Sequence, residues 1–106
     1  MSTPIVPPEY SAKIERLRIY FQAKMPELVV RGGWDFDTRS ASFPFDDGPK
    51  LKHLLRVSVE VLQDFSEEKI VQRLEQEEWE QVLMRAAPDQ MAIFTSKGFK
   101  FRKRPD

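Results

Sequence analysis

The chain has 106 residues, its 17 Lys and Arg balance its 17 Asp and Glu, and it contains no Cys. This length predicts one domain, and the lack of thiols excludes disulfides, thiolate metal sites and a cysteine nucleophile and fits a reducing compartment. No apolar run is long enough to span a membrane, and the first residues lack the basic start and apolar core of a secretory signal, so we expect a cytoplasmic protein that does not bind membranes.

Residues 1–8 contain three prolines and are predicted to form an extended lead-in to a helix that begins at about Glu9, since proline is tolerated at the first helical position. Apolar side chains then recur at steps of four, three and four residues, which places them on one helical face: Tyr10, Ile14, Leu17 and Phe21. Met25-Pro26 ends this helix, because the residue before a proline disfavours the helical conformation.

Three stretches in the next part of the chain show strand patterns: 28–31, 34–38 and 42–45. Pro44 cannot donate to a sheet, so the third stretch is predicted to be an edge strand or the end of a strand. Four aromatic residues recur here with a period of two. They are expected on the inner face of the sheet, with an exposed platform for bases or a peptide as the alternative: Trp34, Phe36, Phe43 and Phe45.

The clearest strand pattern covers residues 55–62, where apolar residues alternate with mostly polar ones. Residues 67–87 are predicted to be helical, with Ser66 as the N-cap. The apolar residues of this stretch would cover a wide arc of the helix surface rather than one narrow stripe. Either the helix is buried over much of its surface, or it breaks near Glu75-Gln76. Two short strands joined by a turn complete the chain: 91–94 and 99–102.

The order α-β-β-β-α-β-β predicts an α+β domain with a mainly antiparallel sheet and two main helices packed on one of its faces, while the other face stays open to solvent. The domain is expected to cover residues 9–102, with residues 103–106 as a basic C-terminal tail. Six apolar residues from the helices and strands are expected in one buried cluster: Leu17, Phe21, Val57, Val59, Leu83 and Ile93.

Candidate residues for catalysis or metal binding are few. Four carboxylates lack the spacing of a calcium-binding loop: Asp35, Asp37, Asp46 and Asp47. A nuclease centre with Glu60 would need a lysine two residues later, where the chain has Leu62. His53 is the only histidine, and the chain has no Gly-x-Ser-x-Gly motif whose serine His53 could activate as a nucleophile. We therefore expect no catalytic residue, no bound metal and no cofactor.

The last ten residues depart from the balanced composition. Five cations within eight positions are candidate contacts for an anion or a nucleic acid: Lys97, Lys100, Arg102, Lys103 and Arg104. Phe99 and Phe101 alternate with these cations, so a strand would place the rings on one face and the charges on the other. An acidic stretch between residues 60 and 80 complements this basic segment, and a homodimer is therefore one expectation.

Several short motifs resemble those of a small uncharacterised bacterial domain family: Trp34-Asp35, Phe43, Asp47-Gly48, and Val57-Ser58-x-Glu60-x-Leu62-x-Asp64-Phe65 before a helix and a closing apolar strand with Thr95. The resemblance covers about residues 33–100. It implies a compact bacterial α+β domain. Since the family has no assigned function, the resemblance assigns no active residue.

These observations favour a small, non-catalytic binding or adaptor protein that acts through contacts with another protein or with a second copy of itself. The alternative is a nucleic-acid-binding protein that contacts phosphates through its basic C-terminal strand. Salt dependence separates the two functions, since phosphate contacts weaken steeply with added salt whereas an apolar protein interface does not.

Overall fold

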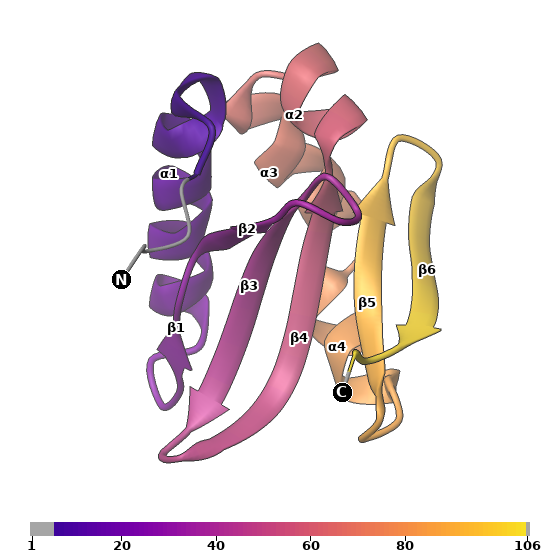
Figure 1. The fold of residues 1–106 in the computed structure, drawn as a ribbon. Helices are drawn as coiled ribbons and strands as arrows, with labels where there is room; N and C mark the ends of the chain where they lie inside the picture. The colour runs from indigo at the N-terminus through magenta and orange to yellow at the C-terminus, as the bar shows by residue number, and fades with distance from the viewer. Residues whose placement is uncertain (1–5, 106) are drawn as a thin grey trace.

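The computed structural model describes residues 6–105 and has the predicted α+β class, with 40% helix and 34% strand. A six-stranded sheet has its helices on one face (Figure 1). Residues 1–5 of the predicted lead-in and Asp106 of the predicted tail lie outside the described residues. Along the chain the elements are α1 (Pro8–Lys24), β1 (Val29–Val30), β2 (Gly33–Asp35), β3 (Ser40–Asp47), β4 (Lys50–Ser58), α2 (Val59–Asp64), α3 (Glu67–Gln76), α4 (Trp79–Arg85), β5 (Gln90–Thr95) and β6 (Gly98–Lys103).

The strands follow the order β1-β3-β4-β5-β6, and β2 pairs with the same strand as β1, namely β3. All pairs are antiparallel except β4 with β5, because the chain crosses between these two through α2, α3 and α4 rather than through a hairpin. All four stretches with strand patterns contribute a strand, so the observed order has four strands after the first helix instead of the predicted three, and three helices in place of the second. β6 forms one margin of the sheet.

The first helix follows the sequence pattern closely. It begins at Pro8, one residue before the predicted start, and its predicted stripe is buried: Tyr10, Ile14, Leu17 and Phe21. The Phe21 ring lies at the centre of the core, with its centroid 5.0 Å from that of Phe43 and 4.8 Å from that of Trp79. Neither α1 nor any other helix within residues 6–105 is long and apolar enough to cross a membrane.

The strand predicted for residues 55–62 ends at Ser58, and the chain continues as the short helix α2. The prediction is therefore wrong beyond Ser58. Val61 and Leu62 are both fully buried, and this arrangement suits a helix, since neighbours in a strand point to opposite faces. Val59 is partly buried and packs against the edge of the core cluster.

The prediction that Pro44 marks an edge strand or a strand end is also wrong, because β3 has β4 on one side and β1 and β2 on the other. The Pro44 carbonyl accepts a hydrogen bond from the Arg31 N–H at 3.0 Å, between the residues of β1 and β2. The nitrogen and oxygen of one strand residue point to the same side. The Pro44 nitrogen, which carries no hydrogen, therefore also faces Arg31, in the gap between β1 and β2.

The helical stretch predicted for residues 67–87 breaks, as one of the two alternatives anticipated. Glu78 separates α3 from α4 with a left-handed backbone (φ 54°, ψ 54°), which a right-handed helix cannot continue through. Ser66 caps α3 as predicted, since its hydroxyl oxygen accepts a hydrogen bond from the Lys69 N–H at 3.2 Å. The break turns α4 so that Trp79 is buried in the core.

Four of the six residues predicted for the buried cluster are fully enclosed in it: Leu17, Phe21, Val57 and Leu83. Val59 and Ile93 are not part of this fully buried group. The neighbours of Ile93 in β5, Ala92 and Phe94, face the helices, so Ile93 faces the other side of the sheet. The aromatic residues expected on the inner face are buried there except for Phe36. Phe36 is 61% exposed, since β2 ends at Asp35 and Phe36 lies in the following turn.

Candidate functional site

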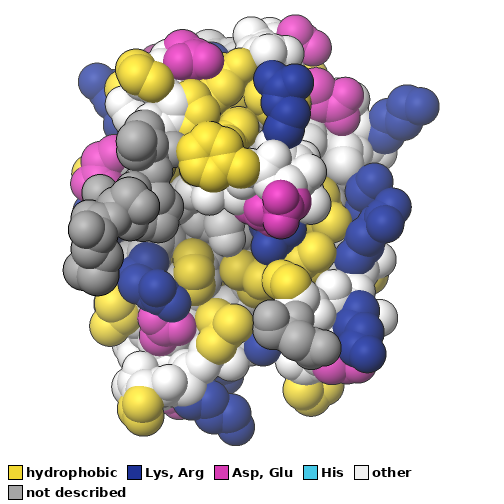
Figure 2. All heavy atoms as spheres, in the orientation of Figure 1, with side chains coloured by type: hydrophobic (Ala, Val, Ile, Leu, Met, Phe, Trp, Pro, Cys, Tyr) yellow, Lys and Arg dark blue, Asp and Glu magenta, His cyan; other side chains and the backbone are white. Residues whose placement is uncertain are grey.

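We call the sheet surface opposite the helices the open face. Because strand residues alternate between the two faces, every second residue of β4 and β5 points to it, and Leu54, Arg56, Met91 and Ile93 are among them. Figure 2 shows hydrophobic side chains in the middle of this face and Lys and Arg side chains along the margin formed by β6. The open face thus combines an apolar floor with a cationic margin.

A hollow of about 300 Å³ lies in the open face across β4, β5 and β6. We call it the basic hollow. Met91 and Ile93 supply its apolar lining, and the charged residues around it are three cations and one carboxylate: Arg56, Lys100, Arg102 and Glu60. Four hydroxyl-bearing residues complete it: Thr38, Ser40, Ser58 and Thr95. This lining suits an anion that also has an apolar part.

Arg56 is the buried cation of the basic hollow, and only 8% of its side chain is exposed. Its Nη1 lies 2.6 Å from Oδ2 of Asp35 and donates to the Thr38 hydroxyl at 3.2 Å. A buried guanidinium requires a partner carboxylate to offset the loss of solvation. Asp35 is that partner, and it fixes the direction in which the rest of the guanidinium points.

The opposite edge of the Arg56 guanidinium is unoccupied. Its Nε is buried and has no hydrogen-bond partner among residues 6–105, and its Nη2 makes no hydrogen bond to that part of the chain either. Buried donors are paired in the great majority of cases. This unpaired donor therefore distinguishes Arg56 from the other buried polar side chains within residues 6–105.

Asp35 orders the wall of the basic hollow. Its carboxylate accepts hydrogen bonds from the Asp37 N–H at 3.0 Å and from the Thr38 hydroxyl at 2.9 Å. Partial burial alone would raise the pKa of Asp35, but these hydrogen bonds and the positive charge of Arg56 together lower it below the usual value. Asp35 is therefore ionised near neutral pH and belongs to the site as a support for Arg56.

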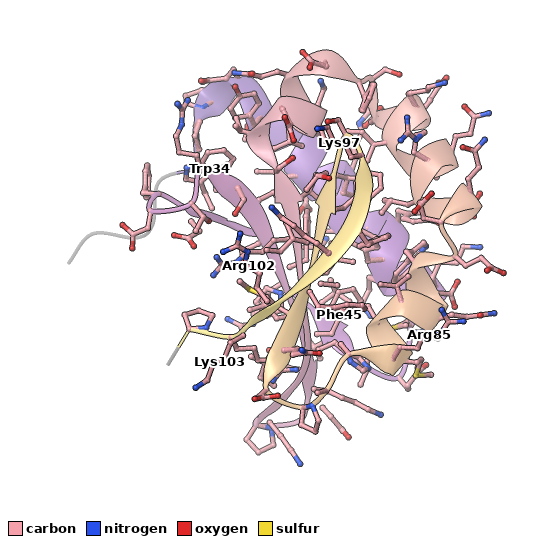
Figure 3. The ribbon with its side chains drawn as sticks, turned by 90° about the vertical axis from the view of Figure 1, so that its right-hand side faces the viewer. Trp34, Phe45, Arg85, Lys97, Arg102 and Lys103 are labelled. Carbon is pink, nitrogen blue, oxygen red and sulfur yellow. The ribbon has the colours of Figure 1, made fainter. Side chains whose placement is uncertain are left out.

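The five predicted cations do not form one cluster. Lys100 and Arg102 line the basic hollow, and Figure 3 shows Arg102 on the side of the sheet away from Arg85 of α4. Lys97 is exposed in the turn before β6, and Lys103 is exposed at the end of β6, inside the strand rather than in a separate tail. Lys100 and Arg102 are thus the members that join Arg56.

Arg104 has a structural position instead. Its guanidinium donates to three backbone carbonyls, those of Gln90 at 3.0 Å, Leu51 at 3.4 Å and Lys52 at 2.7 Å. Its own N–H donates to the Asp89 carbonyl at 2.7 Å. These bonds tie the end of the chain to β4 and to the start of β5.

The two phenylalanines between the cations lie on the opposite face, as the alternation predicted. Phe99 packs against Phe94 in the core with 5.0 Å between ring centroids. Phe101 is 43% exposed. The rings therefore contribute nothing to the basic hollow.

Arg56 was not among the predicted site residues, yet its unpaired donor makes the hollow distinctive. A signal for it was present, since Arg56 is the one charged residue between Leu54-Leu55 and Val57 in an otherwise apolar run. Such a residue in a central strand must find a partner or a ligand. What the sequence could not reveal was the pairing of β4 with β3 and β5 that brings Thr38, Ser40 and Arg102 around it.

The other candidates for chemistry are separated from one another. Asp46 pairs with Arg31 at 2.7 Å, and residues 6–105 contain no group of three His, Asp or Glu side chains that could bind a metal ion. His53 lies within β4. It is half-buried beside Phe45, and burial together with the charges of Lys52 and Arg104 lowers its pKa.

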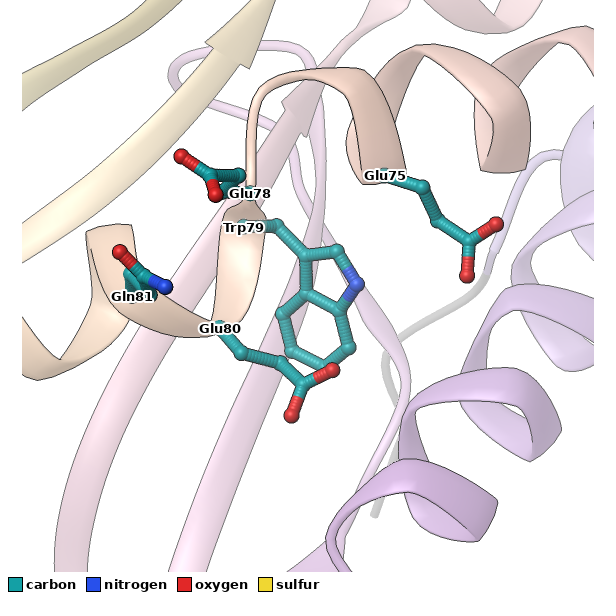
Figure 4. Close-up of a pocket in the computed structure, with 5 residues that line it drawn as sticks. All are labelled: Glu75, Glu78, Trp79, Glu80 and Gln81. Carbon is teal, nitrogen blue, oxygen red and sulfur yellow. The ribbon is translucent and has the colours of Figure 1, made fainter.

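An acidic hollow lies on the helical side, over the Trp79 ring (Figure 4). Glutamates from the end of α3 and the start of α4 surround it: Glu75, Glu78 and Glu80. Glu75 accepts a hydrogen bond from the Tyr20 hydroxyl at 3.1 Å. Burial, together with the charges of Glu75 and Glu80, raises the pKa of Tyr20 to about 12. This part of the surface is negative where β6 is positive.

The chain matches no protein-family model, no curated protein and no solved structure. The resemblance to a small bacterial domain family therefore stays a prediction.

Proposed function

We propose that this chain is a small, non-catalytic binding protein of the cytoplasm that uses its open face to bind an acidic segment of another protein. The observation on which this proposal depends is the basic hollow, where Lys100, Arg102 and Arg56 surround an apolar lining. An acidic side chain can pair with these cations, while neighbouring apolar side chains of the same segment contact Met91 and Ile93.

Nucleic-acid binding is the second candidate, and the row of exposed cations on and beside β6 supports it: Lys97, Lys100, Arg102 and Lys103. We rank it second because no aromatic side chain is among the residues that line the basic hollow, whereas sheets that bind single strands stack bases on aromatic rings. Arg104, which the sequence offered as a fifth phosphate contact, is engaged with backbone carbonyls.

The test is fluorescence anisotropy with a labelled peptide in which Asp and Glu alternate with Leu and Val. We expect the wild-type chain to bind it, and Lys100→Glu with Arg102→Glu to weaken binding by about tenfold or more, since charges at a partly desolvated rim contribute on the order of 1 kcal/mol each. A peptide with Lys in place of the acids should not bind.

The matched control is Lys69→Glu with Arg85→Glu, which makes the same change in net charge on exposed residues of α3 and α4. Figure 3 shows Arg85 on the side of the molecule opposite Arg102. This control should bind the acidic peptide as the wild type does. Equal loss in both double variants would mean that net charge alone drives binding, and the proposal would then be wrong.

Labelled single- and double-stranded oligonucleotides in the same assay decide between the two candidates. Binding that falls steeply with salt and disappears in Lys100→Glu with Arg102→Glu would establish the nucleic-acid function in place of the first.

A further inference from the structure

The guanidinium of Arg56 has two edges, and the described residues use only one of them. Nη1 is engaged with Asp35 and Thr38, whereas Nε is buried without a partner in the described part of the chain. The side chain is more than nine-tenths buried and lines the basic hollow. The unpaired donor therefore belongs to a side chain that lines the hollow.

Two other arginines show that the Nε–Nη2 edge can bind a carboxylate in the same protein, whereas Arg104 uses it for backbone carbonyls. Arg18 donates from Nε and Nη2 to the two carboxylate oxygens of Glu15, at 2.7 and 2.9 Å. Arg31 uses the same two nitrogens toward Asp46, at 2.7 and 3.4 Å. The planar fork of a guanidinium matches the two oxygens of a carboxylate. Arg56 is thus a buried arginine with its carboxylate-binding edge vacant.

We infer that the Nε–Nη2 edge of Arg56 is a receptor for a single carboxylate, supplied by an Asp or Glu side chain of the acidic segment. The inference rests on the proposed function for the source of this carboxylate, although its chemistry follows from the hollow itself. Asp35 fixes the guanidinium before the ligand arrives, and Lys100 and Arg102 add positive charge at the rim. Met91 and Ile93 offer a surface to the methylene groups of the incoming side chain.

The decisive measurement is the ¹⁵N–¹H resonance of the Arg56 Nε–H in the full chain. Arg56→Lys identifies the resonance by its disappearance. Chloride is then replaced stepwise by acetate at constant ionic strength, and in a second titration the acidic peptide is added. We expect a saturable shift of the Arg56 signal in both titrations, while the signals of Arg18 and Arg31 stay in place because their edges are already occupied.

The outcomes separate the inference from the proposed function. A shift with acetate and no binding of the acidic peptide would support the carboxylate receptor and contradict the proposed function. Peptide binding with an unmoved Arg56 signal would overturn the receptor and leave the proposed function standing. A saturable shift with inorganic phosphate and none with acetate would also overturn it, since the hollow would then select a tetrahedral anion.

Arg56→Lys supplies an independent test, because lysine keeps the charge but has no planar edge. We expect its affinity for the acidic peptide to fall by about tenfold or more. Arg85→Lys makes the same exchange at an exposed residue of α4 outside the hollow, so it should retain binding within about threefold. If Arg56→Lys does not fold, the Arg56 Nε–H resonance is assigned in the wild-type chain by through-bond correlation with its own backbone amide, and its titration with acetate still decides the question.

Discussion

At the scale of single residues, Asp35 connects the local turn to the open face. Its carboxylate accepts hydrogen bonds within the turn of residues 35–38 and pairs with Arg56 of β4, on the far side of β3. The Asp35 pKa is lowered in the folded chain, so its contribution to stability is present above the pKa of the unfolded state and is lost as the pH falls through the folded-state pKa.

Asp35→Asn should therefore destabilise the protein at neutral pH by about 2 kcal/mol, because it leaves the Arg56 charge buried without a carboxylate. The difference from wild type should shrink as the pH falls into the range in which Asp35 becomes protonated. Urea unfolding between neutral and acidic pH measures both effects. Asp37→Asn, at an exposed residue of the same turn, should cost much less at neutral pH. A difference that does not change with pH would show that the Asp35 charge contributes nothing.

The ion pairs of Asp35 and Asp46 also determine what we expect for divalent metal binding. Asp35 and Asp46 are engaged with Arg56 and Arg31, and these pairs would have to break before either carboxylate could bind a cation. We therefore expect calorimetric titration with Mg²⁺, Ca²⁺ or Zn²⁺ to show no binding tighter than about millimolar, the weak end of protein calcium sites. A micromolar site that disappears in Asp35→Asn would contradict this expectation.

At the scale of elements, the junctions between β4 and α2 and between α3 and α4 determine how the helices cover the sheet. Both occur where the residue pattern is ambiguous. Glu78 illustrates the second junction, since it adopts a left-handed conformation (φ 54°) that a residue with a Cβ atom rarely visits. The strain at Glu78 is offset by the burial of Trp79 immediately after it.

Glu78→Gly should stabilise the protein by up to about 1 kcal/mol, because glycine adopts this conformation without steric cost. For a domain of this size the thermal midpoint should rise by about 4–8 °C per kcal/mol. Glu77→Gly is the matched control, since Glu77 has right-handed backbone angles (φ −85°, ψ 0°) and glycine there should lower the midpoint. A lower midpoint for Glu78→Gly would show that the Glu78 side chain stabilises the junction more than its backbone strains it.

At the scale of the whole molecule, opposite charges lie on opposite sides of the fold. Exposed cations follow β6 at the sheet margin, and glutamates surround Trp79 on the helical side (Figure 4). An edge strand also has unpaired N–H and C=O groups that can accept another strand. Together these features favour a weak association between two copies of the chain.

We expect light scattering at low ionic strength to show an average mass that rises above the monomer mass over about a hundredfold range of concentration, as mass action requires. Added salt should reverse the rise, because surface charges are screened. Lys100→Glu with Arg102→Glu should abolish it, whereas Lys69→Glu with Arg85→Glu should not. A monomer mass at every concentration would exclude the dimer and leave another protein as the partner.

Local patterns were sufficient for much of this fold. The steps of four, three and four from Tyr10 to Phe21 define a buried helical face whatever surrounds it, and the Ser66 cap depends only on residues three positions apart. The alternation of Phe99 and Phe101 with Lys100 and Arg102 likewise determined which residues would share a face.

Other features depend on neighbours that are distant in the sequence. The pattern of residues 55–62 is compatible with a strand or with a strand followed by a helix. The chain leaves the sheet at Ser58 because a helix there buries both Val61 and Leu62 in the core. Pro44 is tolerated inside the sheet because the strand beside it is interrupted, and Ile93 faces away from the helices because Ala92 and Phe94 fill the core. Arg56 became a candidate receptor only when β3, β5 and β6 enclosed it. Sequence periodicity is thus a property of single elements, whereas burial and the vacancy of a hydrogen-bonding edge are properties of the packed molecule.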